Sequence, residues 1–317
     1  IFPGFDGGAE RGGAATDPTV VSEVVSGLLD TLRMRRARVN TALAGHAVIV
    51  KRLSLPAMSQ AELNEAIPWE AEQYIPFDLS EVQLDYQVVG GEGDATKNSL
   101  DVLLVAAKRD RIDDRSSVIA QTGRKPVVLD IEAFALANAY KMNYPERTDD
   151  LSVLVHVGRS VTIVCLLEKG EPVFTRDISI GGQIHLESLL RELGPGGLDE
   201  LSAKRILHGQ FPADMTAEQV ASVLREASAQ LVLEVRKTVD FYRATAPVEK
   251  INRVVLSGGA YQAVGLVDML ASEFDAPVDV FDPFRRVTRS SRTIGTDVTG
   301  PEYAVAVGLA MRQEGDR

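Results

Sequence analysis

The thirty residues from Val153 to Gly182, "VLVHVGRSVTIVCLLEKGEPVFTRDISIGG", constrain the fold more than any other part of the chain. Three apolar runs are separated by short turns at Gly158-Arg159 and at Glu168–Gly170. Apolar runs of this length that are joined by tight turns are typical of successive antiparallel strands. The third run ends at Gly181-Gly182, and we expect a helix to begin there.

Length and composition are those of a soluble globular protein with two lobes. The 317 residues suffice for two domains with separate cores, and 45% of them are hydrophobic and 25% charged. A net charge of −11 argues against nucleic-acid binding, which needs clustered Lys and Arg to replace counterions. A single cysteine, Cys165, excludes an internal disulfide and suits a reducing compartment. The sequence contains no run of 18 apolar residues, so it predicts no membrane-spanning helix.

Helical and strand periodicities alternate on both sides of a candidate linker at Tyr144–Asp150, which predicts a mixed α/β protein in two halves. Pro68 predicts a kink or a second helical start within the helix that surrounds it. We expect helices over residues 20–32, 59–74, 111–121, 131–140, 199–207, 217–243, 264–274 and 302–312, and further strands over 47–56, 81–89, 100–107, 126–130, 253–259 and 278–281.

Two glycine turns in the second half are candidate phosphate or nucleotide contacts. The first is Gly158-Arg159-Ser160, between two strands, and the second is Ser257-Gly258-Gly259, between a strand and a helix. Backbone N–H groups in such turns can point at a phosphate, and glycine lets a ligand approach the main chain. An ordinary turn is the alternative for each. The P-loop, dinucleotide-binding and nucleophile-elbow glycine motifs do not occur in the sequence.

The histidines provide no metal motif. His46, His156, His185 and His208 form no H-E-x-x-H pattern and have no cysteine partners, so the sequence predicts no metal site. His156 lies in the apolar run before the first glycine turn. A buried neutral imidazole satisfied by hydrogen bonds is one interpretation of this residue, and a contact to a bound phosphate is the other.

Several ordered segments resemble one family over essentially the whole chain. The most specific is "WEAEQYIPFDLSEVQLDYQVV" (Trp69–Val89), and "VLDIEAFALANAY" (Val128–Tyr140), "EVRKTVDFYR" (Glu234–Arg243), "PVDVFDPF" (Pro277–Phe284) and "GPEYAVAVGLAMR" (Gly300–Arg312) match as well. Together with the three-strand segment and the two glycine turns, they resemble the actin-like ATPase superfold. Within it they resemble the family of type IV pilus assembly protein PilM, a relative of the bacterial division protein FtsA.

This resemblance implies an actin-like (ribonuclease H-like) α/β fold of two lobes with an FtsA-style inserted subdomain. The first lobe would combine residues 1–53, 129–150 and 295–317, with the inserted subdomain at 54–128. The second lobe would combine 151–182 and 230–294, with a helical subdomain at 183–229. Because the chain begins with Ile1 and a glycine-rich stretch, we expect the N-terminal strands of the first lobe to be missing.

The resemblance also implies that ATP, possibly with Mg²⁺, binds between the lobes. It implies phosphate contacts at Gly158, Arg159 and Ser160, adenosine contacts at Gly258, Gly259 and Ala260, and ribose or adenine contacts at Lys204 and at Glu234 or Lys237. For the three charged helix residues, an exposed helix face is the alternative.

Two departures from the family argue against hydrolysis. The family's first phosphate loop, near the true N-terminus, does not occur in this chain, and the second phosphate turn has His156 where Asp is usual. An imidazole cannot replace a carboxylate as a hard anionic ligand for Mg²⁺. We therefore expect no catalytic residues, and a protein that binds nucleotide as a scaffold rather than as an enzyme.

Membership of this family would make the protein a cytoplasmic component of the type IV pilus machine, involved in twitching motility and protein transport. It would lie at the inner face of the cytoplasmic membrane, attached only through protein partners. Its main partner would be the cytosolic N-terminal tail of PilN. We expect indirect links to PilO, PilP and PilQ, and further contacts with the motor ATPase and the platform protein PilC.

The PilN tail would bind between the first lobe and the inserted subdomain. Candidate residues for the wall or support of that groove are Trp69, Tyr74, Ile75, Pro76 and Phe77. Aromatic and apolar side chains with a proline can form a rigid surface for an extended peptide. Packing of Tyr74 and Phe77 in the core of the inserted subdomain is the alternative.

Two other functions are compatible with the same superfold. An ATP-dependent phosphotransferase would need a carboxylate base, and Asp130 and Glu132 are the candidates near a suitable strand end. A filament-forming ATPase like FtsA would need a membrane-targeting amphipathic helix at its C-terminus, and "MRQEGDR" is not such a helix.

Overall fold

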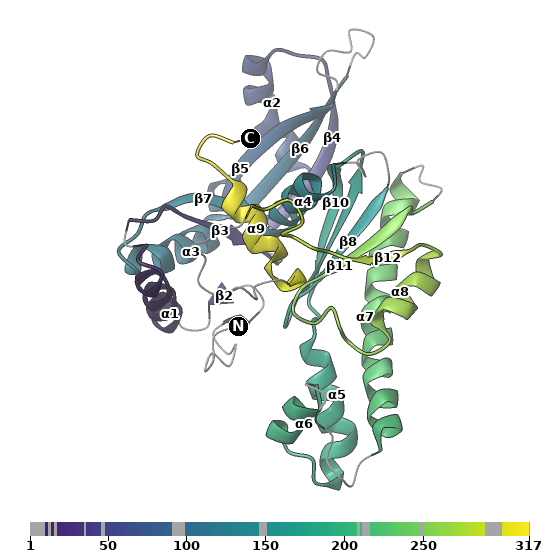
Figure 1. Ribbon diagram of the computed structural model, residues 1–317. Coiled ribbons are helices and arrows are strands. Elements are labelled where there is room, and N and C mark those ends of the chain that lie inside the picture. The colour runs from purple at the N-terminus through teal and green to yellow at the C-terminus, as the bar shows by residue number, and fades with distance from the viewer. Residues whose placement is uncertain are drawn as a thin grey trace. The chain divides into compact units, whose positions relative to one another are not determined.

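The computed structural model describes residues 10–11, 14–15, 18–34, 36–45, 48–90, 99–145, 151–207, 210, 216–246, 250–288 and 300–316. Most of the predicted linker, as well as His46 and His208, lies outside the described residues. The chain divides into two compact units (Figure 1). Unit 1 comprises Ile1–Ala135 with Leu309–Arg317, and unit 2 comprises Leu136–Gly308.

The larger sheet of unit 1 is antiparallel and carries one helix. Its strand order is β4 (Val48–Pro56), β6 (Ser99–Lys108), β5 (Val82–Gly90), and helix α2 (Gln60–Glu72) covers it. A short 3₁₀ turn, η1 (Leu79–Glu81), leads into β5. The core of this part combines α2 and the residues after it with all three strands, and consists of Leu53, Leu55, Leu63, Ile67, Ala71, Ile75, Val82, Val102, Leu104 and Ala106.

Helix α2 runs unbroken through Pro68, so the predicted second helical start does not occur there. Ser59 and Glu62 form a capping box that fixes the first turn of the helix. Leu63 and Ile67 bury one face of it against the sheet. These contacts offset the main-chain hydrogen bond that proline removes.

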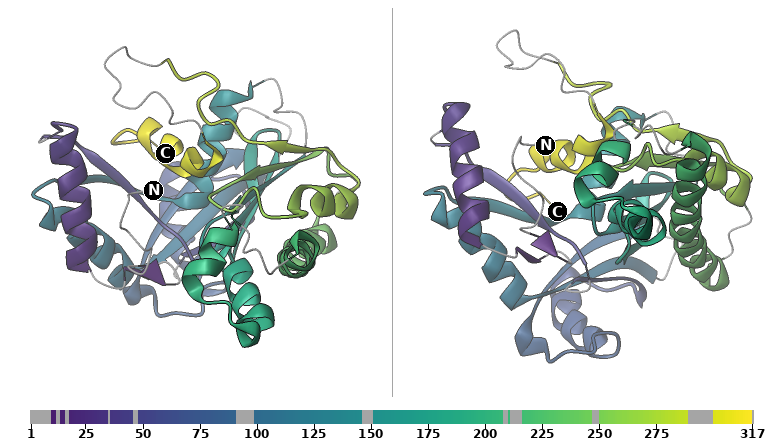
Figure 2. Two further views of the ribbon diagram at one scale, coloured as in Figure 1. Left: turned by 60° about the horizontal axis from the view of Figure 1, so that its bottom comes forward. Right: turned by 90° about the horizontal axis from the view of Figure 1, so that it is seen from below.

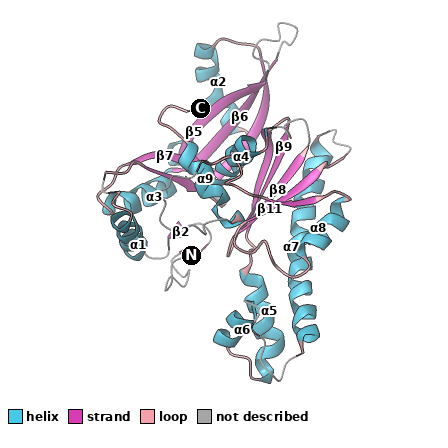
Figure 3. Ribbon diagram, in the orientation of Figure 1, coloured by secondary structure: helices cyan, strands magenta, loops and turns pink. Residues whose placement is uncertain are grey.

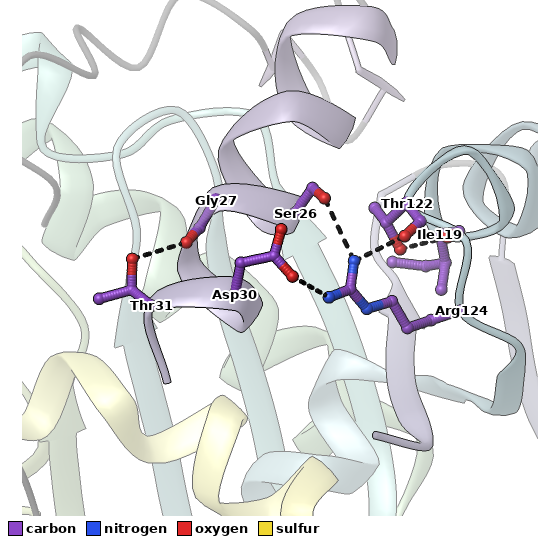
Figure 4. Close-up of polar contacts among 7 residues, drawn as sticks. All are labelled: Ser26, Gly27, Asp30, Thr31, Ile119, Thr122 and Arg124. Carbon is purple, nitrogen blue, oxygen red and sulfur yellow. Dashed lines mark hydrogen bonds and ion pairs between the residues drawn. The ribbon is translucent and has the colours of Figure 1, made fainter. Parts of the chain in front are cut away.

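The rest of unit 1 is built on a parallel strand pair, β3 (Val39–Leu43) with β7 (Pro126–Ile131). Helix α3 (Arg109–Gln121) packs against both strands, and α1 (Pro18–Thr31) packs against α3. Two short strands, β1 (Glu10–Arg11) and β2 (Ala14–Ala15), also pair. The buried Arg124 side chain joins α1 to the turn after α3 (Figure 4). Its guanidinium donates to Ser26 Oγ (3.2 Å), Thr122 O (2.6 Å) and Asp30 Oδ1 (2.8 Å).

Unit 2 contains a five-stranded mixed sheet (Figure 3). The order is β10 (Glu171–Ile178), β9 (Thr162–Glu168), β8 (Ser152–Val157), β11 (Arg253–Ser257), β12 (Val278–Val280). Strands β8, β9 and β10 are antiparallel neighbours, which confirms the predicted three-strand segment. Strands β8, β11 and β12 run parallel, so the carboxyl ends of these three strands lie at one edge of the sheet.

Helices α7 (Ala217–Thr245) and α8 (Leu266–Phe274) pack against each other and against this sheet, as Figures 1 and 2 both show. Helices α5 (Gln183–Leu193) and α6 (Glu200–Leu207), joined by η3 (Gly194–Gly196), pack on the first turns of α7. A separate small core forms there from Leu186, Leu189, Leu198, Ala203, Ile206, Val220 and Leu224. The predicted helices and strands of unit 2 are confirmed, with ends that differ by a few residues.

Helices α4 (Glu132–Asn143) and α9 (Ala304–Met311, preceded by η4, Pro301–Tyr303) each contribute residues to both units. Within unit 2, the end of α4 is fixed by Asn143, whose amide donates to Pro283 O (2.9 Å) and accepts from the Arg286 N–H (2.9 Å). Tyr140, Tyr144 and Phe281 form an aromatic cluster beside it. None of the helices that the structure describes has the length and apolar content needed to cross a membrane.

Candidate nucleotide site

The two predicted glycine turns leave the sheet of unit 2 side by side. Each follows the carboxyl end of a parallel strand, the first after β8 and the second after β11. Ser257, the last residue of β11, is the register partner of His156, the residue before the end of β8, and His156 Nδ1 lies 3.0 Å from Ser257 Oγ. The edge formed by the carboxyl ends of parallel strands is where open α/β sheets bind ligands. The structure therefore brings together the two segments that the sequence singled out separately.

The first turn is closed by main-chain hydrogen bonds to the start of α5. Gly158 N–H donates to Val161 O (3.0 Å), and Gly182 N–H donates back to Gly158 O (2.8 Å). Gln183 N–H donates to Arg159 O (2.8 Å). A Cβ on Gly182 would lie only 2.3 Å from the Ala260 side chain, so the backbone at 182 also contacts the second turn. These bonds hold the 158–161 turn against the N-terminus of a helix.

The second turn passes directly over the end of β8. Gly258 has φ +95°, and a Cβ there would lie 2.3 Å from Val157 O. Its N–H donates to Pro301 O (3.2 Å), and Ala260 N–H donates to Val157 O (3.1 Å). At Gly259, by contrast, an added Cβ would meet nothing within 4 Å. The turn thus needs glycine at 258, and it leaves open space beside 259 that a ligand can occupy.

Basic side chains lie on the α5–α6 side of the first turn. Arg159 Nε donates to Gln183 Oε1 (2.9 Å), which fixes the guanidinium beside the start of α5. Lys204 on α6 forms an ion pair with Glu200 (2.8 Å). The hydrogen bond and charge of Lys204, and to a smaller extent the charge of Arg159, lower the pKa of the Glu200 carboxyl. Lys204 and Arg159 therefore both act electrostatically on the Glu200 carboxylate.

The other two predicted adenine or ribose contacts lie further along α7. Glu234 and Lys237 pair with each other (2.6 Å), and Lys237 is exposed. Two other α7 residues contact the loop between the second turn and α8: Ser228 Oγ lies 2.8 Å from Val264 O, and the Arg225 side chain lies over Gly265. The roles of Glu234 and Lys237 stay a prediction. No sequence motif marks Ser228 or Arg225. Only the packing of α7 against the loop before α8 places them near this site.

His156 does not provide the chemistry that a magnesium ion requires. The imidazole is partly buried, burial lowers its pKa to about 4, and it is therefore neutral at pH 7. Its Nδ1 contacts Ser257, and Mg²⁺ strongly prefers oxygen ligands in near-octahedral geometry. Among the described residues, no group of three or more His, Cys, Asp or Glu side chains could hold a metal ion. The residues at this strand end do not fit Mg²⁺, and a charged His156 that contacts phosphate is also disfavoured at neutral pH.

We expect His156 to make the protein less stable in acid. The unfolded chain takes up a proton near pH 6.5, whereas the folded protein does so only near pH 4. Stability from this group is therefore complete above pH 6.5 and falls as the pH drops toward 4, by at most about 3 kcal/mol. His156→Asn removes this titration, so its free energy of unfolding should change less between pH 7 and pH 5 than that of the wild type. Urea titrations at both pH values measure this difference, and equal changes in the free energy of unfolding would contradict the prediction. His185 is present in both proteins, so its own titration contributes equally to each.

The five predicted partner-binding residues divide into exposed and buried positions in unit 1. Trp69 on α2 is 73% exposed, Tyr74 is 41% exposed, and Pro76 is also exposed. Ile75 is buried in the core between α2 and the sheet, and Phe77 packs partly against that core. The Lys108 Nζ lies 4.1 Å from the centre of the Phe77 ring. Ile75 and Phe77 can therefore support such a surface, while Trp69 and Tyr74 are available for contact.

Asp130, one of the two candidates for a phosphotransferase base, forms a buried ion pair. Asp130, at the end of β7, is buried beside Arg312, whose Nε lies 3.0 Å from Asp130 Oδ2, and its Oδ1 accepts from Ile131 N–H (2.8 Å). Burial raises the pKa of this carboxyl, and the main-chain bond and Arg312 oppose the increase. The ion pair fixes the end of α9 to β7, which disfavours a role for Asp130 in proton transfer.

Comparison with known proteins identifies the class and then the family. The chain has the actin-like fold: it superposes on the ethanolamine utilization protein EutJ from Carboxydothermus hydrogenoformans (TM-score 0.56, 15% identity, 95% of this chain and 77% of that one) and on MreB5 of Spiroplasma citri bound to AMPPNP (TM-score 0.54, 11% identity, the same coverage). It is more similar to a chain of the PilM-PilN type IV pilus biogenesis complex, with TM-score 0.82 and 26% identity over 98% of this chain and 88% of that one. The model of the type IV pilus assembly protein PilM family matches residues 8–314. The chain belongs to that family.

Proposed function

We propose that this protein is a cytoplasmic scaffold of the type IV pilus machine that binds the cytosolic N-terminal tail of PilN. The observation that carries this proposal is the similarity over 98% of the chain to a PilM-PilN complex. The exposed Trp69 on α2 supports it, since an exposed tryptophan on a well-packed helix is a typical anchor for a partner. Contact with PilN would hold the protein at the inner face of the membrane, and would link it indirectly to PilO, PilP and PilQ, to PilC and to the motor ATPase.

Titration of the full chain with a synthetic PilN tail peptide tests this proposal directly. We expect saturable one-to-one binding by calorimetry, and no binding of a peptide with the same composition in scrambled order. Lack of binding by a correctly folded chain would refute the partner proposal.

We further propose that the edge of the unit 2 sheet binds a nucleotide. Gly158, Arg159 and Ser160 would contact the phosphates, Lys204 would contact the ribose or adenine, and the open main chain at Gly259 would lie along the adenosine. The main-chain bonds between the first turn, α5 and the second turn orient these groups before the ligand arrives. ATP is the expected ligand, and nucleotide occupancy would shift the protein toward the state that binds its partner better.

Replacement of His156 tests how metal enters nucleotide binding. We expect the wild type to bind ATP about equally with Mg²⁺ and with EDTA, and to hydrolyse it at no measurable rate, because the strand end supplies no carboxylate. His156→Asn should behave in the same way. His156→Asp places a carboxylate at this position, and its ATP affinity should rise several-fold when Mg²⁺ is added. Hydrolysis by the wild type at an enzyme-like rate would contradict this prediction.

A further inference from the structure

A buried histidine joins three segments of unit 2 through side-chain contacts. His185, on the first turn of α5, is 3% exposed. Its Nδ1 lies 3.1 Å from Gly182 O, and its Nε2 lies 3.0 Å from Ser228 Oγ on α7. Ser228 is fully buried, and its Oγ lies 2.8 Å from Val264 O, in the loop before α8. The three contacts form one continuous path from α5 through α7 to that loop.

A hydrogen bond at each of the three contacts needs a proton of its own, which makes three. A neutral His185 imidazole and the Ser228 hydroxyl together supply only two. A carbonyl oxygen only accepts, so the Gly182 contact requires a proton on His185 Nδ1, and the Val264 contact requires the Ser228 hydroxyl proton. The contact between Nε2 and Oγ then requires a third proton, on Nε2. A neutral imidazole leaves one contact without a hydrogen bond, whereas an imidazolium completes all three.

Both ends of this path lead to the candidate nucleotide turns. Gly182 N–H donates to Gly158 O, so the His185 contact with Gly182 acts on the first turn. Val264 ends the segment that begins at Gly258, so the Ser228 contact acts on the second turn. The side-chain contacts of His185 are with Gly182 and Ser228 and not with the strand-end pair His156 and Ser257, so His185 would position the turns rather than contact a ligand.

We propose that His185 and Ser228 form a proton-dependent joint that positions the two glycine turns relative to each other, and that uptake of one proton by His185 closes it. The effect on ligand affinity rests on the proposed nucleotide site. Proton uptake binds one hydrogen ion to Nε2, whose new N–H donates to Ser228 Oγ and frees the hydroxyl proton for Val264 O.

The surroundings of the joint set its pH range. Burial lowers the pKa of His185, and the bond to Gly182 O opposes this decrease. The neutral imidazole, which leaves one of the three contacts without a hydrogen bond, therefore predominates at pH 7. The segment 258–265 contains no charged residue. The charged side chains of the first turn, of α5 and of α6, and those within three residues of Ser228 on α7, are exposed or partly exposed: Arg159, Glu187, Arg191, Glu192, Glu200, Lys204, Arg205, Arg225 and Glu226.

Ser228→Ala tests the joint in the full chain without any ligand, and Thr238→Val is the matched control. Thr238 is also fully buried on α7, but its hydroxyl donates to Glu234 O within the same helix. NMR of ¹⁵N-labelled histidine, assigned with His185→Asn, follows the protonation of His185. Ser228→Ala removes the acceptor of the imidazolium, so the midpoint should fall by about one pH unit, while Thr238→Val leaves it unchanged. Amide hydrogen exchange over 258–266 should be faster in Ser228→Ala than in the control. If neither the titration midpoint of His185 nor the amide exchange rates over 258–266 changed in Ser228→Ala, the proposed joint would be overturned.

Binding of a fluorescent ATP analogue then tests the link to the nucleotide site. We expect Ser228→Ala to weaken binding roughly tenfold relative to Thr238→Val, the value of one buried hydrogen bond. Equal affinities would overturn the positioning role. If the wild type binds no analogue, the proposed nucleotide site fails and the link to affinity fails with it, while the NMR midpoint and exchange still decide whether the joint exists.

Discussion

Gly258→Ala is expected to destabilise unit 2 by about 2 to 4 kcal/mol and to abolish nucleotide binding. Two effects act together at this position. The residue has φ +95°, which an L-amino acid rarely adopts, and its new Cβ would lie 2.3 Å from Val157 O and 2.5 Å from Val157 C. Relief of this clash must move the turn away from the end of β8. Urea unfolding followed by circular dichroism, and titration with ATP, measure the two consequences.

Gly259→Ala provides the matched control, because it adds the same methyl group one residue later. Nothing lies within 4 Å of a Cβ at this position. Its free energy of unfolding should remain within about 0.5 kcal/mol of the wild type. If the two alanine variants were equally stable, the close approach of the second turn to β8 would not exist in solution.

Trp69→Ala is expected to weaken binding of the PilN tail peptide by roughly thirtyfold or more, the typical loss when an anchoring tryptophan is truncated. The side chain is 73% exposed, so its removal should change the free energy of unfolding by less than about 0.5 kcal/mol. Calorimetric titration of the variant with the same peptide measures the effect. Full affinity in Trp69→Ala would remove this residue from the proposed contact surface.

Ile75→Ala separates support of that surface from direct contact. Ile75 is buried in the core between α2 and the antiparallel sheet, and its truncation should cost about 2 to 5 kcal/mol of stability. The expected loss of tail binding should therefore accompany local unfolding, which Trp69→Ala should not show. A stable Ile75→Ala variant with no tail binding would instead assign Ile75 a direct contact.

The local elements were predictable where the pattern of one segment determines the structure. The three strands of 153–178 follow from apolar runs and tight turns, and the Lys169-Gly170 turn has the positive φ values that such a hairpin requires. Helix α7 follows from its apolar stripe and a capping box at Thr216 and Gln219. The short strand β3 was missed, because the one strand that it pairs with among the described residues, β7, lies more than 80 residues further along.

The candidate site was predictable only in its two glycine turns. The pairing of His156 with Ser257 depends on the register of two strands 101 residues apart, and no local pattern encodes it. Asp130 is a second example. Its sequence position is compatible with a catalytic base, but the ion pair with Arg312, near the other end of the chain, is formed only in the folded protein. Sequence reasoning recognises the residue types at such positions, but only tertiary packing shows which partner occupies each of them.

The contact between Gly182 and Ala260 has an evolutionary consequence. A Cβ at 182 would lie 2.3 Å from the Ala260 side chain and 3.7 Å from its Cα. The methyl group at 260 therefore excludes every side chain at 182, and glycine at 260 would remove the closest obstacle. The two positions, 78 residues apart, cannot drift independently, and a lineage that gains a side chain at one of them must first lose it at the other.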